Sequence, residues 1–331
     1  MADEPKRTSP TIADVAELAG VSRAVASRAL APEPRPVGAD KRQRVLKAAA
    51  DLGFRPNLLA QGLMSKSVNI VAVIVNHIHD LSDLDLFDLL LDRLQSIGKQ
   101  VVLLRVGSVD RVDQFLSRGI AYHVDAALVF SDFADAATVR NMFRTDRIVM
   151  MNGRHDHLSA AVVPDEASGI AEAVADAALK GVHRAALLTG RATSEVERIR
   201  VAAYRRSFAA HGIAVTSEIQ GDYSYQSGHA AAAALIAGEP DAVFCTSDAM
   251  AMGVLDARRA DFPGNRPQRF RLYGFDNLSM THFDAYPIAS IGYDKATYVD
   301  AMVQLIEAAD TPHGETEPVS IPTAFFPRAT A

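Results

Sequence analysis

Five residues near the amino terminus have the types and spacing that suit contact with nucleic acid. Arg23 and Arg28 lie five positions apart, and an arginine can donate two hydrogen bonds to guanine, which discriminates against other bases by about 1–3 kcal/mol. Ala24 offers a methyl group, for instance to thymine, whereas Ser22 and Ser27 suit backbone phosphates or helix capping. We predict DNA contact by all five residues; the alternative for each arginine is a solvated surface charge.

Two short helices must position these side chains. Thr11 followed by Asp14 predicts a helix that starts at Ile12, because this pair caps helix amino termini. Gly20 supplies a turn, and Ser22 caps a second helix. The predicted inner faces are Ile12, Val15, Ala16 and Ala19 on the first helix and Val25, Ala26 and Ala29 on the second. This pattern predicts a helix-turn-helix, whose second helix enters the major groove of DNA.

A third helix closes this small unit. After the proline-rich loop 31–37, we expect Asp40 together with Gln43 to cap it and Gly53 to end it. The residues expected to face the core are Val45, Leu46, Ala49 and Leu52.

The amino-terminal pattern resembles the headpiece of the lactose-repressor (LacI/GalR) family. The matching residues are Thr11, Asp14, Val15, Ala16, Ala19, Gly20, Val21, Ser22, Ser27 and Arg28, followed by Gly53-Phe54-Arg55-Pro56-Asn57, Ala60 and Leu63. The resemblance implies a hinge segment at 56–67 that is helical only when docked on DNA. It also implies that Leu63 wedges between base pairs in the minor groove. Asn57 has the side-chain type of a group that contacts a DNA phosphate or caps a helix.

The remainder of the chain alternates strands with helices. Apolar runs such as 68–75, 101–106, 126–130 and 148–151 alternate with helical stretches such as 166–179, which implies parallel sheets covered on both faces. The later apolar runs are 160–163, 185–188, 242–246 and 271–274, and Cys245 reads as a buried strand residue. We predict an all-α helix-turn-helix headpiece plus an α/β body of two doubly wound parallel-sheet lobes, an architecture similar to periplasmic sugar-binding proteins.

The same resemblance implies a binding site for a small-molecule effector at the carboxyl ends of the strands. Arg200, Asp248 and Asp276 match positions of the family's ligand contacts, Tyr223 adds a stacking face, and Asp83 falls in the turn after the first strand. Carboxylates and a guanidinium suit a sugar-like or other polar metabolite. The alternative is a salt-bridge network that holds the lobes together. Two His-x-His pairs, His77/His79 and His155/His157, are read as solvated, and no metal or cofactor is predicted.

Composition bounds the remaining possibilities. Residues 1–69 hold 11 Lys or Arg and 7 Asp or Glu, a net charge of +4, whereas the remaining residues carry 23 and 33, a net charge of −10. This split favours a nucleic-acid surface in the headpiece alone. The polar start, the lack of a long apolar run and the single cysteine predict a cytoplasmic protein with no membrane partner. Phosphate-loop and hydrolase motifs are absent, so no enzyme is predicted.

These observations predict a transcriptional regulator that binds a near-palindromic operator as a homodimer under effector control. The predicted domains are an arm at 1–10, a DNA-binding domain at 11–55, the hinge segment at 56–67 and an effector-binding and dimerisation domain at 68–331. The alternatives are a solute-binding protein and a ligand-independent regulator whose body serves as a dimer scaffold. Whether effector releases DNA or enables its binding stays open.

Overall fold

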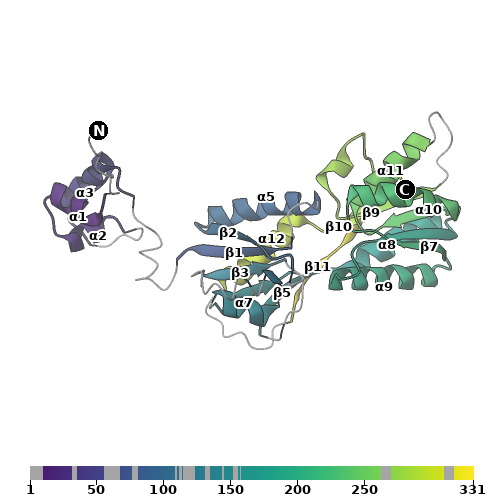
Figure 1. Cartoon of the computed structure of the whole chain (residues 1–331), viewed down its shortest axis with the longest axis horizontal. Coiled ribbons are helices and arrows are strands. Elements are labelled where there is room, and N and C mark those ends of the chain that lie inside the picture. Colours follow the sequence, from purple (N-terminus) through teal and green to yellow (C-terminus); the bar gives the residue numbers. More distant parts are fainter. Residues whose placement is uncertain are drawn as a thin grey trace. The chain divides into compact units, whose positions relative to one another are not determined.

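The computed structural model describes residues 10–31, 36–55, 68–76, 81–108, 110–111, 114, 124–130, 135–143, 145–151, 156, 158–261, 270–308 and 317–331. The chain divides into two compact units, Met1–Val68 and Asn69–Ala331 (Figure 1). The predicted arm and the predicted hinge segment, which carries Asn57 and Leu63, lie outside the described residues apart from Pro10.

The first unit is the predicted three-helix headpiece, formed by α1 (Ile12–Leu18), α2 (Arg23–Ala29) and α3 (Ala39–Leu52). Thr11 and Asp14 cap α1 reciprocally, and the Ser22 hydroxyl accepts a hydrogen bond from the Val25 amide at the start of α2. Gly20 and Gly53 have φ values of 63° and 65°, as their predicted roles at a turn and a helix end require. The core consists of Val15, Ala16, Ala19, Ala26, Ala29, Val45, Ala48 and Ala49.

The third helix differs from the prediction in two respects. Gly38 is its N-cap residue, and Asp40 instead forms an ion pair with Arg44 one turn further on. Leu46 and Leu52 are 50% and 36% exposed, so their prediction as core residues is wrong. Helix α3 instead contributes Val45, Ala48 and Ala49 to the core, and these small side chains allow it to pack against α1 and α2.

The first sheet of the second unit has the strand order β11-β5-β4-β3-β1-β2, and all its neighbouring strands are parallel. Alternate residues of β1 face opposite layers. Val71, Val73 and Val75 pack beneath α5 and α12, whereas Ala72 and Ile74 pack against α7. The elements are β1 (Ile70–Val75), α5 (Leu81–Ser96), β2 (Gln100–Arg105), β3 (Ala126–Val129), α7 (Ala136–Phe143), β4 (Ile148–Met150), β5 (Ala160–Asp165), α12 (Lys295–Glu307) and β11 (Val319–Pro322).

The second sheet repeats this plan in the order β12-β10-β9-β8-β6-β7, in which only the β10–β12 pair is antiparallel. Helices α8 and α9 cover one face, and α10 and α11 cover the other. Its elements are α8 (Glu166–Leu179), β6 (Arg184–Thr189), α9 (Glu195–Ala210), β7 (Ala214–Gln220), α10 (Tyr225–Ala237), β8 (Ala242–Cys245), α11 (Asp248–Asp261), β9 (Arg271–Phe275), the 3-10 helix η1 (Ser279–His282), β10 (Ala289–Gly292) and β12 (Ala324–Phe326). The two sheets confirm the predicted pair of doubly wound lobes.

The chain passes between the two lobes three times. It leaves the first sheet between β5 and α8, returns between β10 and α12, and leaves again between β11 and β12 (Figure 1). At the third crossing, Thr323 fastens the segment to the start of α8, because its hydroxyl accepts from the Gly169 amide at 2.9 Å and donates to the Asp165 carbonyl. A Cβ at Gly169 would lie 2.7 Å from Ile291 and 2.8 Å from Thr323, so only glycine fits between these segments.

No helix in the described part of the chain combines the length and apolar character needed to cross a membrane. Cys245 lies in β8 and is fully buried, as predicted.

Candidate functional site

The predicted DNA-contacting residues share the solvent-facing side of α2. Ser22, Arg23, Ala24, Ser27 and Arg28 are all exposed, whereas Ala26 and Ala29 on the opposite side are buried. The helix therefore presents two guanidinium groups to solvent, and its small inward residues hold it against α1 and α3. Contact with DNA by each of these side chains stays a prediction.

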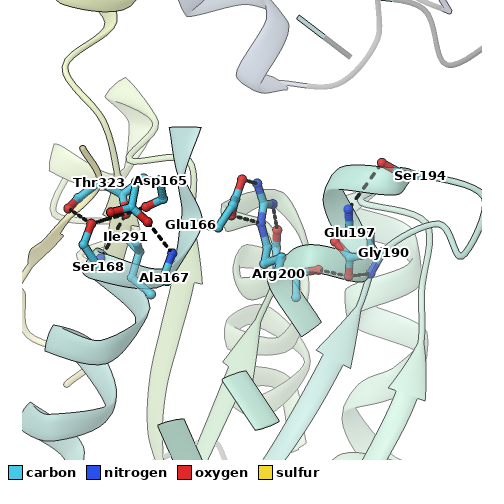
Figure 2. Close-up of polar contacts among 12 residues, drawn as sticks. Asp165, Glu166, Ala167, Ser168, Gly190, Ser194, Glu197, Arg200, Ile291 and Thr323 are labelled. Carbon is cyan, nitrogen blue, oxygen red and sulfur yellow. Dashed lines mark hydrogen bonds and ion pairs between the residues drawn. The ribbon is translucent and has the colours of Figure 1, made fainter. Parts of the chain in front are cut away.

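A buried ion pair lies at the carboxyl ends of the second sheet's strands. Arg200 on α9 donates from Nε and Nη2 to the two carboxylate oxygens of Glu166 at 2.7 and 2.9 Å, and its Nη1 donates to the Thr246 carbonyl at 2.7 Å (Figure 2). The guanidinium also stacks 3.6 Å from the centroid of the Phe275 ring. Burial alone would lower the pKa of Arg200, but the Glu166 charge raises it well above its usual value. The guanidinium is therefore permanently charged and fixed in direction.

Glu197 lies one turn before Arg200 on α9 and organises the neighbouring loops. Its carboxylate accepts hydrogen bonds from the Gly190 amide at 2.5 Å, the Thr246 hydroxyl at 2.7 Å and the Tyr223 hydroxyl at 2.8 Å. A Cβ at residue 190 would lie 1.9 Å from the Tyr223 ring, so the ring occupies space that only glycine leaves open. Burial, with the Glu197 charge, raises the pKa of Tyr223, which therefore stays a hydrogen-bond donor.

Asp248 is fully buried at the start of α11. Its two carboxylate oxygens accept from the Leu278 amide at 2.9 Å and the Ser290 hydroxyl at 2.7 Å. Burial raises the pKa of Asp248 to about 7, although these two hydrogen bonds oppose the shift. This geometry assigns Asp248 to the support of the loop after β9, and it leaves little of the carboxylate for a ligand.

Asp276 follows β9 directly and has a φ of 104°, a conformation that few residues other than glycine adopt. Its amide donates to the Ile291 carbonyl, and its own carbonyl accepts from Lys295. Among the described residues, its carboxylate has no hydrogen-bond or ion-pair partner. Burial raises its pKa well above the usual value, and the Arg200 charge offsets only part of the shift.

The loop after β9 also contacts the first lobe. Asp85 on α5 accepts from the Ser279 amide and hydroxyl, both at 2.8 Å, and pairs with Lys295 at 3.5 Å. Lys295 in turn donates to the carbonyls of Asp276 and Asn277. Hydrogen bonds therefore connect the loop after β9 to α5 and α12, whereas the Asp85–Lys295 ion pair joins two helices of the first lobe.

Three of the five predicted effector residues, Arg200, Tyr223 and Asp276, are thus linked at one sheet edge through Glu197, Thr246 and Phe275. The side chain of Asp83 is outside the described residues, as are His77, His79, His155 and His157. In the described ranges, no three His, Cys, Asp or Glu residues are grouped as a metal site requires.

Sequence reasoning missed Glu166 and Glu197. Glu166 directly follows the end of β5, and Glu197 stands three positions before Arg200 on the same helix, a spacing that places both side chains on one helix face. The position of Glu166 at a strand end and the spacing of Glu197 from Arg200 could have indicated that both residues belong to the site.

Comparison with known proteins gives matches at both ends of the chain. Residues 11–57 match the family described as bacterial regulatory proteins, lacI family, and residues 174–331 match a periplasmic binding protein-like domain. The catabolite control protein A of Priestia megaterium is 27% identical over 279 residues, which cover 82% of this chain and 83% of that protein. The HTH-type transcriptional repressor CytR of Escherichia coli (strain K12) is 26% identical over 326 residues, which cover 95% of this chain and 94% of the repressor.

A solved structure shows the same fold. The lac repressor dimer bound to operator and the anti-inducer ONPF has a TM-score of 0.81 and 22% identity, and the match covers 98% of this chain and 99% of that one. The helix-turn-helix match, the binding-protein-like match and the similarity to regulators along nearly the whole chain agree with the two units of the structure. Residues 11–57 thus match the DNA-binding domain of the lacI family, residues 174–331 match a periplasmic binding protein-like domain, and the chain is similar to transcriptional regulators of that family along nearly its whole length.

Proposed function

We propose that this protein is a repressor that binds near-palindromic operator DNA as a homodimer and responds to a small polar molecule. In this proposal, residues 11–55 read DNA, 56–67 form the hinge segment, and 68–331 bind the effector and dimerise. A regulator of this kind acts where the DNA is, in the cytoplasm.

The observation that carries the proposal is the presence of two different surfaces in one chain. The headpiece exposes Arg23 and Arg28 on a capped helix, and the body holds a buried, charged Arg200 close to the unpartnered carboxylate of Asp276. A protein that only transported a solute would have no use for the first surface. A regulator that ignored ligands would gain nothing from the second, since no described residue of the protein itself uses the Asp276 carboxylate.

Ligand control follows from the linkage between Asp276 and the first lobe. A ligand that bound Asp276 would act on the loop after β9. That loop is joined to the first lobe, because Lys295 donates to two of its carbonyls and its Ser279 donates to Asp85. Because binding shifts the equilibrium between two arrangements only by its differential affinity for them, the ligand need favour one arrangement of the lobes by only a few kcal/mol. Asp248 supports this loop, and Arg200, Tyr223 and Asp276 supply the direct contacts.

DNA binding is tested by titrating the purified protein against a palindrome from its own promoter region and against random DNA, at several salt concentrations. We expect a preference for the palindrome and an affinity that falls with salt, as phosphate contacts require. Arg23→Ala should reduce the preference by about 1–3 kcal/mol, whereas Arg205→Ala, on an exposed surface of the body, should leave it unchanged. Equal affinity for both DNAs would contradict the proposal.

Ligand control is tested by thermal unfolding of the DNA-free protein against sugars, sugar phosphates, polyols, nucleobases and divalent metals. A ligand at a hundredfold over its dissociation constant stabilises by about 2.7 kcal/mol. We expect Asp276→Ala to abolish the shift, and the stabilising compound to change the affinity for the palindrome. A palindrome preference that no stabilising compound alters would instead identify a ligand-independent regulator.

A further inference from the structure

The start of α5 contacts the second lobe at two successive turns (Figure 1). Leu81, its first residue, packs against the apolar cluster of the second lobe that contains Leu278. Asp85, one turn further along, accepts hydrogen bonds from the Ser279 amide and hydroxyl, both at 2.8 Å. Residues four positions apart lie on the same face of a helix, so one face of α5 makes both an apolar and a polar contact with the second lobe.

Lys295 at the start of α12 completes the contact. Its ammonium pairs with Asp85 at 3.5 Å and donates to the carbonyls of Asp276 and Asn277 at 3.3 and 2.9 Å. The side chains of Asp85 and Lys295 are only 24% and 15% exposed, so solvent screens their pair less than it screens a surface pair. Burial alone would raise the pKa of Asp85, but the hydrogen bonds from Ser279 and the Lys295 charge lower it below its usual value. The carboxylate is therefore charged at neutral pH.

The covalent connections between the lobes leave their angle to such contacts. All three crossings are short: Asp165 is followed directly by α8, two residues separate β10 from α12, and Thr323 alone separates β11 from β12. The first and third crossings lie side by side, because the Ser168 hydroxyl donates to the Thr323 carbonyl at 3.0 Å (Figure 2). A few residues at the ends of elements are enough to absorb a rotation of two lobes. Asp85 and Ser279 belong to none of these crossings, so their contact acts on the angle and not on the connection.

We propose that Leu81, Asp85, Lys295 and Ser279 form a latch that holds the two lobes at one angle in the ligand-free protein, and that release of this latch changes the affinity for DNA. Asp85 is then a positioning residue, which acts on DNA binding through the angle between the lobes. The consequence for DNA rests on the proposed function, whereas the latch itself does not. Because the protein supplies the latch contacts, a molecule that changes the angle must favour the new arrangement by more than these contacts favour the old one. A variant without the latch should therefore show, in the absence of ligand, part of the change that a ligand produces.

The first test measures the arrangement of the lobes and needs neither DNA nor ligand. Nitroxide spin labels on Gln304→Cys of α12 and Ala209→Cys of α9, both exposed positions, report the distance between the lobes of the full chain by double electron–electron resonance. The native Cys245 is fully buried and stays unlabelled. Labelled protein is mixed with an excess of unlabelled protein, so that a dimer carries at most one labelled subunit.

Asp85→Ala should raise the ratio of unlatched to latched molecules about tenfold or more, because it removes hydrogen bonds to a charged group, and should give a second distance. Ser279→Ala, which alters the latch from the other lobe, should act in the same direction. Asp85→Asn keeps an oxygen for the Ser279 amide and should lie between wild type and Asp85→Ala. Asp88→Ala on α5 and Asp284→Asn between η1 and β10 change exposed residues and serve as controls that keep the wild-type distance. The same distance distribution in Asp85→Ala and wild type would overturn the inference.

The second test asks whether the latch controls DNA binding. The ligand-free affinity for the palindrome should differ at least about fivefold between Asp85→Ala and wild type, the lower end of common allosteric couplings, and Asp88→Ala should match wild type. The dependence on salt should stay the same, because the headpiece is unaltered. A changed distance with an unchanged affinity would refute control of DNA binding by the latch. If wild type and all variants bind the palindrome and random DNA equally, the proposed function fails, and the distance measurement still decides whether the latch exists.

Discussion

Replacing the buried Asp248 by asparagine should remove a pH dependence from the stability of the body. The folded protein holds the proton of Asp248 up to about pH 7, whereas the unfolded chain releases it near the usual value of 3.8. Between these values the folded state binds more protons, so stability conferred by this group is greatest in acid and falls as pH rises towards 7. The three-unit difference corresponds to about 4 kcal/mol over the whole range.

The asparagine fits the same hydrogen bonds. Its carbonyl oxygen can accept from the Leu278 amide, and its NH2 group can donate to Ser290, whose hydroxyl also lies 3.3 Å from the Ile291 carbonyl. The main difference between the two proteins is therefore the ionisable proton. Between pH 5 and pH 8, the stability of wild type relative to Asp248→Asn should fall by about 3 kcal/mol, because two of the three units lie in this interval.

The assay is urea unfolding followed by far-UV circular dichroism at pH 5 and pH 8, with wild type, Asp248→Asn and Asp284→Asn in parallel. Contributions from other titrating groups are common to the three proteins and cancel in the differences. Parallel pH profiles for wild type and Asp248→Asn would refute the reasoning, because they would show that the carboxylate ionises in the folded protein as it does in water.

Three further substitutions test the packing and the caps. Arg200→Ala should lower the free energy of unfolding in urea by about 3–5 kcal/mol, since it leaves the buried Glu166 carboxylate without its partner. Arg205→Ala, which breaks an exposed pair, should lower it by under about 1 kcal/mol. Similar losses for the two variants would contradict the buried pair. Gly190→Ala should displace the Tyr223 ring and destabilise by about 1–3 kcal/mol, visible as a lower urea midpoint; a neutral effect would mean that the ring is not fixed there. Thr11→Ala should destabilise α1 by about 1 kcal/mol, measured as faster amide exchange confined to the headpiece, and unchanged exchange would argue against the cap.

Local rules predicted the elements whose own residues determine them. The first two helices begin at residues whose side chains cap them, and α8 spans Glu166–Leu179 as predicted. Tertiary contacts decided the rest. Asp40 had the right type for a cap, but the chain enters α3 two residues earlier, through Gly38. Strand β7 was not predicted because it is an edge strand with polar residues on both faces.

The site was predictable only in part. Arg200 and Asp276 stand where the family resemblance places ligand contacts, and the structure brings them to one sheet edge. The support role of Asp248 depends on Leu278 and Ser290, which are 30 and 42 positions away. No pattern within one stretch of sequence reveals such partners. Likewise, the pairing of Glu166 with Arg200 joins residues 34 positions apart on different helices.

The three crossings between the lobes have a consequence for how the chain acquires its structure. The first sheet is complete only when β11 pairs with β5, and α12 covers the same sheet. Both elements follow every strand and helix of the second lobe except β12, so a ribosome synthesises them after it has made nearly all of the other lobe. The amino-terminal lobe must therefore wait with an open edge and an uncovered apolar face, the kind of surface that promotes aggregation. For this protein, the lobe that is made first is the lobe that finishes folding late.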